Sequence, residues 1–335
     1  MAEKFSRWRD QATGVQPFLY PLPPTPDASP ALQLLLLPFK AVLGSIRILL
    51  VLLLLLAQAL IVEGLLRVFD FVPGGYAAVT RSINASICRL ILAVIGVVWI
   101  NVETVQLRKT GRSPPQVPYD PKKGDVIVAN SSSYLDLLYL VFRYNATLTL
   151  PVSDADASSG AAARIVGFQR TSLLGAILAS GKLPGPNKNA ESLASLMKKA
   201  PGPVVVFPEC ATSNNRALIK LADFVESATG SPGPSRIFVL TFRYPAPTSL
   251  APSLTNPIPS DTFPALPLAH LYALTSRLVP YTFTVRKLHP TDSPKRLEWA
   301  ALAETLAATA RLKRVGALGW REKAAFLDFR RIKGR

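Results

Sequence analysis

A polar segment that follows an apolar strand has side chains suited to binding an anionic group. Val204 to Phe207 are four apolar residues that predict a buried strand, and Pro208 ends it because proline has no N–H for strand pairing. Residues 209–216 then supply hydroxyl, amide, carboxyl and guanidinium groups, and a turn there would add free backbone N–H groups. Asn214 and Asn215 tolerate positive φ, which favours a tight turn. We expect an anion-binding loop, and an ordinary strand-to-helix connection is the alternative.

A second polar segment follows an earlier strand. Val126 to Ala129 predict that strand, and residues 130–136 then read Asn-Ser-Ser-Ser-Tyr-Leu-Asp before an apolar helix. In α/β folds, ligands bind at the carboxyl ends of strands. We therefore expect the two polar segments, and with them Asp136 and Glu209, to converge over one pocket.

Both segments resemble site blocks of the glycerolipid acyltransferases, which move a fatty acyl group from coenzyme A to a lysophospholipid. Residues 207–215 are similar to the family block Phe-Pro-Glu-Gly-Thr-x-Ser-Asn-Gly, with Cys210 and Asn215 at its two glycine positions. Residues 130–136 are similar to the block Asn-His-x-Ser-x-x-Asp, with Ser131 at the histidine position. The resemblance implies acyl-CoA as co-substrate, with no bound cofactor and no metal. It implies catalytic roles for Asp136 and Ser131 and substrate-binding roles for Asn130, Ser133, Glu209, Thr212, Ser213, Asn214 and Arg216.

The missing histidine leaves the catalytic base open. In the family this histidine takes the proton of the acceptor hydroxyl, and the aspartate orients it. A serine hydroxyl cannot hold a proton at neutral pH, and losing a positioned base costs on the order of 10² to 10⁴ in rate. Asp136, or a water between Ser131 and Asp136, could take the proton; a histidine from elsewhere could reach the site; or the site could bind lipid without reacting. We expect the two histidines of the chain, His270 and His289, to be structural or surface residues.

The two ends of the chain carry a further resemblance. Residues 3–21 resemble the opening of the fungal lysophosphatidic acid:oleoyl-CoA acyltransferases of the endoplasmic reticulum and lipid droplets, and residues 315–326 extend the likeness. That branch also lacks the usual histidine. The resemblance implies an enzyme that makes phosphatidic acid for phospholipid and triacylglycerol synthesis. The alternative is a non-catalytic lipid-binding or droplet-scaffolding protein on a degenerate acyltransferase fold.

A third family block, whose final arginine touches the substrate phosphate, has only a partial counterpart. Residues 174–184 resemble its start, but no arginine stands at its end. Lys182, Lys188 and Arg170 are nearby cations that could serve instead. Each is equally explained as a solvated surface charge.

An apolar segment near the N-terminus predicts membrane attachment. Ala41 to Val62 contain only three polar residues, and 22 residues make a helix of roughly 33 Å, long enough for a bilayer core. Arg47 lies near one end, where its side chain can snorkel to the headgroups. A signal peptide is excluded because the segment starts too late and is too long. A shorter run, Leu90 to Ile100, predicts either a re-entrant or hairpin piece or a core helix leading into a strand at Val102.

The charge balance points to an anionic partner. There are 38 Lys and Arg against 21 Asp and Glu, a formal charge of +17. The chain has no nucleic-acid motif, so we expect acyl-CoA, lysophospholipid and membrane lipids as partners and no nucleic acid. Two cysteines are too few for a disulfide framework, which favours a soluble part facing the reducing cytosol.

The order of elements predicts an α/β fold with a mixed β-sheet flanked by helices, and the resemblance makes it glycerol-3-phosphate acyltransferase-like, with an N-terminal hydrophobic membrane anchor. We divide the chain into a proline-rich arm (1–40), in which Pro17 to Pro30 should not pack, membrane-anchoring helices (41–105) and an acyltransferase-like domain (106–335). We predict strands at 125–130, 147–152, 204–207, 237–243 and 281–288, and helices at 134–142, 190–199, 218–226 and 297–310.

Overall fold

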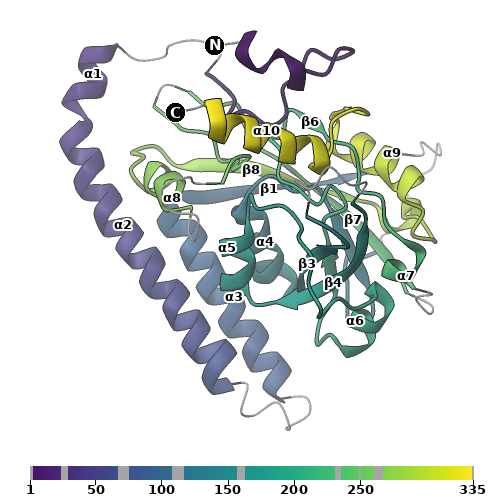
Figure 1. The fold of residues 1–335 in the computed structure, drawn as a ribbon. Helices are drawn as coiled ribbons and strands as arrows, with labels where there is room; N and C mark the ends of the chain where they lie inside the picture. The colour runs from purple at the N-terminus through teal and green to yellow at the C-terminus, as the bar shows by residue number, and fades with distance from the viewer. Residues whose placement is uncertain are drawn as a thin grey trace.

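A five-stranded mixed sheet forms the centre of the computed structural model, which describes residues 3–23, 29–66, 75–107, 117–156, 163–230, 235–248, 250–259 and 267–333 (Figure 1). The strands are β1 (Val97–Val105), β2 (Val126–Ala129), β3 (Leu148–Ser153), β4 (Ile165–Thr171), β5 (Val204–Val206), β6 (Ala217–Leu218), β7 (Ile237–Arg243), β8 (Tyr281–Leu288) and β9 (Lys313–Arg314). The helices are η1 (Glu3–Trp8), α1 (Pro30–Leu35), α2 (Leu37–Gln58), η2 (Ala59–Leu65), α3 (Gly75–Ile95), α4 (Tyr134–Tyr144), α5 (Leu173–Ala179), α6 (Leu193–Lys199), α7 (Glu226–Thr229), α8 (Leu268–Thr275), η4 (Pro290–Asp292), α9 (Trp299–Ala310) and α10 (Trp320–Lys333).

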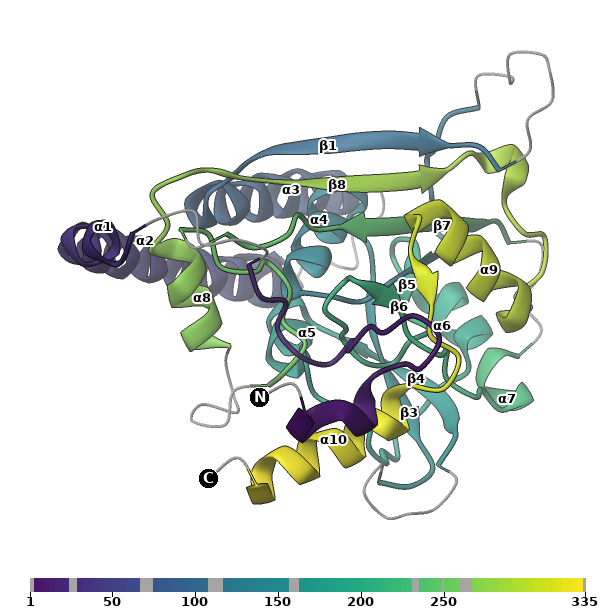
Figure 2. The same ribbon diagram turned by 90° about the horizontal axis from the view of Figure 1, so that it is seen from above.

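The sheet has the order β1-β8-β7-β2-β5, and Figure 2 shows β1, β8 and β7 side by side. Strands β7, β2 and β5 are parallel, β8 runs antiparallel to β7, and β1 is parallel to β8. Val128 pairs with Val206 on one side and with Val239 on the other. The carboxyl ends of β2, β5 and β7 therefore meet at one edge, and the predicted mixed sheet is confirmed.

Both faces of the central strands are covered, which explains their continuous apolar sequences. Along β2 the side chains alternate: Ile127 and Ala129 pack in the cluster that contains residues of α3 and α4, whereas Val126 and Val128 pack with residues of α6 and α9. This period of two is the geometry of a pleated strand.

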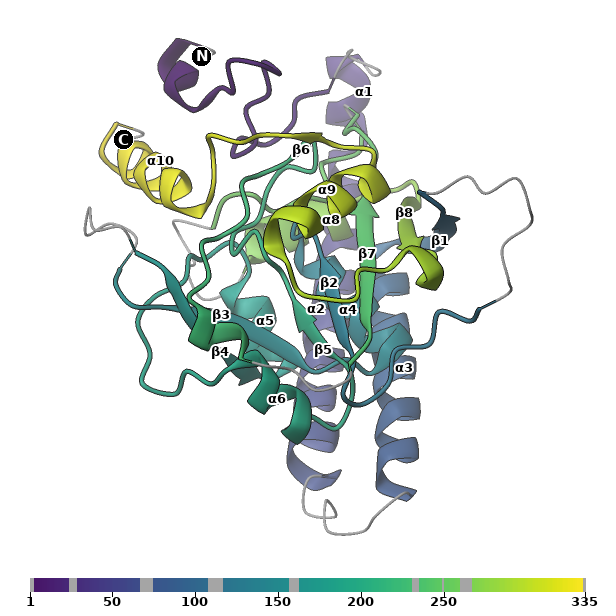
Figure 3. The same ribbon diagram turned by 90° about the vertical axis from the view of Figure 1, so that its right-hand side faces the viewer.

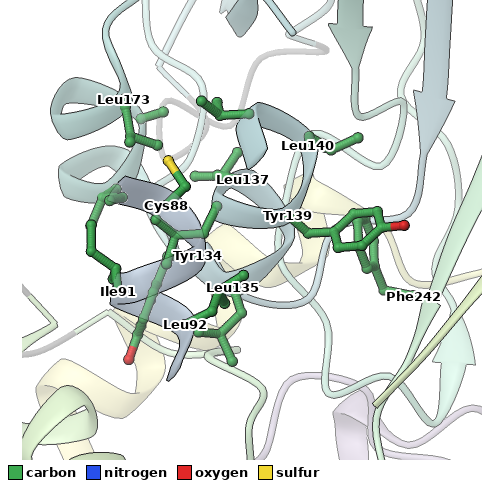
Figure 4. Packing of buried hydrophobic residues seen from close by; sticks show 14 of the residues in the cluster. Cys88, Ile91, Leu92, Tyr134, Leu135, Leu137, Tyr139, Leu140, Leu173 and Phe242 are labelled. Carbon is green, nitrogen blue, oxygen red and sulfur yellow. The ribbon is translucent and has the colours of Figure 1, made fainter. Parts of the chain in front are cut away.

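Helices α2 and α3 lie side by side, and their lower halves in Figures 1 and 3 extend beyond the body of the molecule. By length and composition, Leu37–Leu65 and Ala78–Ile95 are apolar enough to cross a membrane. Leu49, Leu53 and Leu56 of α2 are more than half exposed. The other end of α3 packs against α4, so this pair of helices is continuous with the protein core (Figure 4).

The run Leu90–Ile100 divides between two elements. Helix α3 ends at Ile95, Gly96 takes a positive φ of 106°, and β1 starts at Val97. Leu90–Ile95 therefore belong to a helix that packs along α2, as the hairpin alternative expected, and the strand of the core-helix alternative begins at Val97, five residues earlier than predicted. The guanidinium of Arg47 has protein partners in place of the predicted headgroups: it donates to the carbonyls of Thr275, the last residue of α8, and of Arg277, at 3.3 and 2.7 Å.

Two other predictions fail. Of the predicted helix 218–226, Leu218 belongs to β6, which pairs with β9, and residues 219–225 form no helix. Its N–H groups bind outside the segment, because Ile219 donates to Glu209 and Lys220 donates to the carbonyl of Leu318. The arm was predicted to be unpacked from Pro17, yet Phe18 is buried against Phe326 of α10. Strand β4 and helices α5, α8 and α10 were not predicted.

Candidate active site

The two polar segments meet at the carboxyl ends of β2 and β5. The backbone N–H of Ser131 donates to Oε2 of Glu209 at 2.8 Å, and the N–H of Ser213 donates to the carbonyl of Ser131 at 3.0 Å. Asp136 and Glu209 are both completely buried, and the charge of Asp136 contributes to raising the pKa of Glu209. The predicted convergence of the two segments is therefore present.

Asp136 lies behind the surface of the site and caps α4. Its Oδ2 accepts hydrogen bonds from the N–H groups of Ser132 and Ser133, at 2.8 and 2.9 Å, in a capping box with Ser133. Its Oδ1 accepts a hydrogen bond of 2.5 Å from the hydroxyl of Tyr244. Burial raises the pKa of Asp136 to about 7, and these three hydrogen bonds oppose the rise. Both carboxylate oxygens are thus occupied by protein donors.

Glu209 links the two segments to the chain beyond them. Its Oε2 binds Ser131, and its Oε1 accepts a hydrogen bond of 3.1 Å from the N–H of Ile219. Burial raises the pKa of Glu209 to about 8, while the two N–H donors and the nearby Lys323 oppose the rise. The carboxyl group thereby fixes both ends of the loop that carries the polar residues.

The predicted substrate-binding amides are occupied by backbone contacts. Asn130 exchanges two hydrogen bonds with the backbone of Phe242 in β7, which extends the β2–β7 contact past the end of the strand. The side chain of Asn214 donates to the carbonyls of Gln16 and Leu19 in the N-terminal arm, at 2.7 and 2.8 Å. Both N–H groups of the Asn214 amide are thereby used, Asn130 uses one of its two, and both side chains hold the loops in place.

Cys210 and Asn215, at the two glycine positions of the resembled block, both adopt left-handed backbone conformations, with φ of 50° and 59°. Glycine takes this conformation freely, whereas other residues pay a steric cost. The loop has therefore kept the backbone path that the glycines would favour. The tight turn predicted from Asn214 and Asn215 is present at Asn215.

A cavity of about 300 Å³ opens beside the loops. Ser131, Ser133 and Thr212 line it from the two segments, and Lys182 lies at its wall. Among the described residues that line this cavity, Lys182 carries the one basic side chain. Much of the remaining wall is apolar, and includes Leu137, Leu150, Val152, Ala176, Ala179, Leu183 and Phe207.

The other predicted site residues lie outside the wall of this cavity as the structure describes it. Asn130, Asp136, Glu209, Ser213 and Asn214 are buried behind it. Arg216 is exposed, and its backbone N–H binds the side chain of Asn214. A second hollow of about 520 Å³ is shallow and lined by Arg164, Phe224, Trp299 and Arg321, with no residue of either segment.

Two residues near the site were not predicted. Tyr244 follows β7 directly, at the same sheet edge as the two segments, so the rule that ligands bind at strand ends could have identified it. Lys323 comes from α10 and is completely buried; its Nζ donates to the carbonyl and to Oγ1 of Thr212, at 2.8 and 2.9 Å. Nothing in the local sequence around Lys323 signals this contact.

Both histidines are packed into the structure, as expected. Nδ1 of His270 contacts the hydroxyl of Tyr134 at 3.1 Å, and Nε2 contacts the carbonyl of Ser253 at 2.8 Å. Burial lowers the pKa of His270 to about 4, so its ring is neutral at physiological pH. His289 contacts Thr291. Neither histidine is among the described residues that line the cavity.

Comparison with known proteins supports an acyltransferase. No family model matches the chain, and no solved structure matches it. The chain is 29% identical over 335 residues to a Schizosaccharomyces pombe protein named "Putative lysophosphatidic acid:oleoyl-CoA acyltransferase", and the match covers 99% of each chain. The resemblance noted in the terminal segments therefore extends over almost the whole length, and this chain is similar throughout to a protein named for acyl transfer from oleoyl-CoA to lysophosphatidic acid.

Proposed function

We propose that the protein is a membrane-bound acyltransferase that moves a long-chain acyl group from acyl-CoA to the free hydroxyl of lysophosphatidic acid. The product is phosphatidic acid, for phospholipid and triacylglycerol synthesis. The observation that carries this proposal is the cavity in which both polar segments meet an apolar wall and a single lysine. That combination suits a ligand with an acyl chain and a phosphate group.

In this proposal the cavity residues divide by chemistry. The acyl chain lies along the apolar wall, and Lys182 binds the phosphate in place of the family arginine. Ser131 holds the acceptor hydroxyl, whose oxygen attacks the thioester carbonyl. The new C–O bond forms as the C–S bond breaks, and the hydroxyl proton ends on the thiol of coenzyme A.

The rate enhancement then comes mainly from placement of the two substrates, since no imidazole lines the cavity among the described residues. Asp136 and Ser131 organise the proton transfer in different ways. Ser131 contacts the acceptor, and Asp136 is a positioning residue because it fixes the backbone of Ser132 and Ser133. Glu209 has the same task on the facing loop.

The exposed apolar residues of α2 and α3 would supply membrane attachment in this proposal. The pair of helices lies beside the body of the protein (Figure 1). Glu63 of η2 accepts a hydrogen bond from the N–H of Leu173 at the start of α5, the helix that carries Ala176 and Ala179 of the cavity wall, and in this proposal the lipid acceptor enters from this side. We further propose a glycerol-3-phosphate acyltransferase-like fold, location in the endoplasmic reticulum membrane and on lipid droplets, and a soluble part facing the cytosol.

The phosphate contact gives the sharpest test of this function. Lys182→Gln should raise KM for lysophosphatidic acid about tenfold or more, the loss of one charge-assisted hydrogen bond, with little effect on KM for an uncharged monoacylglycerol. Lys188→Gln is the matched control, because Lys188 is an exposed lysine six residues away that does not line the cavity. Equal KM values for both variants would contradict the proposal.

A non-catalytic lipid-binding protein is the second candidate, and one residue difference and one contact favour it. Ser131 replaces the histidine, and Tyr244 occupies the Asp136 oxygen that an imidazole would need. The double variant Ser131→His, Tyr244→Phe distinguishes the candidates, because it introduces the missing histidine and removes the tyrosine hydroxyl that occupies Oδ1 of Asp136. If the wild-type protein is inactive and the double variant transfers acyl groups, the non-catalytic candidate is supported. If the wild-type protein is active and the double variant is no faster, the enzyme is supported.

A further inference from the structure

Both ends of the chain meet beside the second polar segment. In all three views the N-terminal segment and α10 lie side by side (Figures 1, 2 and 3). Trp8 and Phe18 pack their rings against Phe326 of α10, with centroid distances of 5.5 and 5.7 Å. All three side chains are at least 95% buried. We call residues 3–23 together with α10 the terminal clasp.

The N-terminal side of the clasp holds one end of the loop 209–216. The backbone N–H of Asn214 donates to the carbonyl of Pro17 at 2.8 Å, and its side chain binds the carbonyls of Gln16 and Leu19. Asn214 thus donates three hydrogen bonds to backbone carbonyls of the arm. The arm is a fixed part of the loop's surroundings.

The C-terminal side of the clasp holds the middle of the same loop through Lys323. Both described hydrogen bonds of its ammonium go to Thr212, one to the carbonyl and one to the hydroxyl. Thr212 lines the cavity, whereas Lys323 has no exposed surface. The lysine therefore reaches the cavity only through Thr212.

A lysine at this position is not explained by packing alone. Burying an ammonium group is unfavourable, and an apolar side chain of similar length would fill the same space at lower cost. Burial lowers the pKa of Lys323 to about 7, and the charge of Glu209 opposes that shift. Over a methionine, the lysine adds a positive charge near Glu209 and a pair of donors, and both donors are directed at Thr212.

We propose that Lys323 is a positioning residue for acyl transfer, which fixes Thr212 in the cavity wall from the C-terminal helix. The inference rests on the proposed function and deepens it, because it makes the two chain ends part of the reaction site. Thr212 then presents its hydroxyl to the thioester end of the cavity. Its orientation depends on α10, and α10 in turn is held by the arm.

The test measures kcat and KM with oleoyl-CoA and lysophosphatidic acid, using full-length protein purified in detergent. Lys323→Met should lower kcat about tenfold or more and leave both KM values within about twofold, because it disturbs geometry and removes no direct substrate contact. Arg331→Met removes the same charge from an exposed position of α10 and should leave kcat unchanged. Thermal unfolding confirms that each variant is folded.

A double variant separates positioning from a general effect on the fold. If Lys323 acts through Thr212, Lys323→Met and Thr212→Val together should lose no more activity than the more damaged single variant. Losses that multiply would overturn the inference, as would a folded Lys323→Met with wild-type kcat. If Lys323→Met does not fold, the test uses Thr212 alone: Thr212→Ser keeps the hydroxyl and should stay active, whereas Thr212→Val should lose activity. Equal activities of these two Thr212 variants would overturn the inference. An inactive wild type would instead refute the proposed function.

Discussion

The hydrogen bond between Tyr244 and Asp136 makes a quantitative prediction about pH. The bond is 2.5 Å long, Asp136 is fully buried, and the bond opposes the burial that raises the pKa of Asp136 to about 7. A hydrogen bond to a charged group contributes about 1.5–3 kcal/mol. One pKa unit corresponds to about 1.4 kcal/mol, so Tyr244→Phe should raise the pKa of Asp136 by about one to two units.

The sign follows from which form of Asp136 the site uses. The ionised carboxylate accepts the two N–H groups that fix the loop carrying Ser131, so acyl transfer should fall as pH drops through the pKa of Asp136. Tyr244→Phe should therefore move the acid limb of kcat/KM upward by about one to two pH units. It should destabilise the fold by about 1.5–3 kcal/mol above the raised pKa of the variant, where Asp136 is ionised in both proteins, and by less below the wild-type pKa, where Asp136 is protonated in both.

The assay is phosphatidic acid formation followed by mass spectrometry between pH 5.5 and 9.5. The phosphate of the acceptor titrates in this range, but it does so equally for wild type and variant and cancels in the comparison. Burial raises the pKa of Glu209 to about 8 and lowers the pKa of Lys323 to about 7, so both groups change charge in this range. The shift is therefore taken as the difference between wild type and Tyr244→Phe, and it is measured again in a Glu209→Gln background. Coincident acid limbs for wild type and Tyr244→Phe would refute the assignment of Asp136 as the group that controls the loop.

Three further predictions test other parts of the structure. Asp136→Ala should abolish acyl transfer by purified protein while membrane attachment persists, and unchanged turnover would show that the site is assigned wrongly. Cys210 has a φ of 50°, which glycine adopts freely and a β-branched residue does not. Cys210→Gly should therefore keep activity and a thermal midpoint close to wild type, whereas Cys210→Val should lose about 1–2 kcal/mol of stability. Equal midpoints for the two variants would argue against backbone strain at Cys210. Leu53 is 52% exposed on α2, so Leu53→Arg should weaken membrane retention by about 2.5–3.5 kcal/mol relative to Leu53→Ala in carbonate extraction, and equal retention would mean that this face does not contact lipid.

The strands that were predicted correctly are those whose own residues carry a clear apolar pattern. The strand 237–243 and the strand 281–288 match β7 and β8 residue for residue. The first is a nearly continuous apolar run, which marks a strand buried on both faces, and the second begins by alternating Tyr281, Phe283 and Val285 with threonines, the period of two of a strand. Strand β4 was missed because its sequence, Ile165–Thr171, mixes apolar and polar residues around Gly167. The false helix 218–226 has helix-forming residues, but its N–H groups bind Glu209 and Leu318, which lie outside the segment.

For the candidate site, the position of the two polar segments could be predicted from the sequence, and the contacts of their side chains could not. The two polar segments follow strands, so their convergence was predictable from the sheet. The roles of Asn130 and Asn214 were not, because their partners are Phe242 and the arm, which lie 112 and about two hundred residues away in sequence. Lys323 reaches Thr212 across 111 residues, a contact that no local pattern encodes.

Direct assay of the purified chain tests the central claim. Oleoyl-CoA is offered together with lysophosphatidic acid, other lysophospholipids or monoacylglycerol, and the products are identified by mass spectrometry. We expect phosphatidic acid to be the main product, and Ala179→Trp, which fills the cavity, to abolish its formation without unfolding the protein. A folded wild-type protein that binds these lipids but forms no acylated product, or a blocked cavity that leaves turnover intact, would contradict the account.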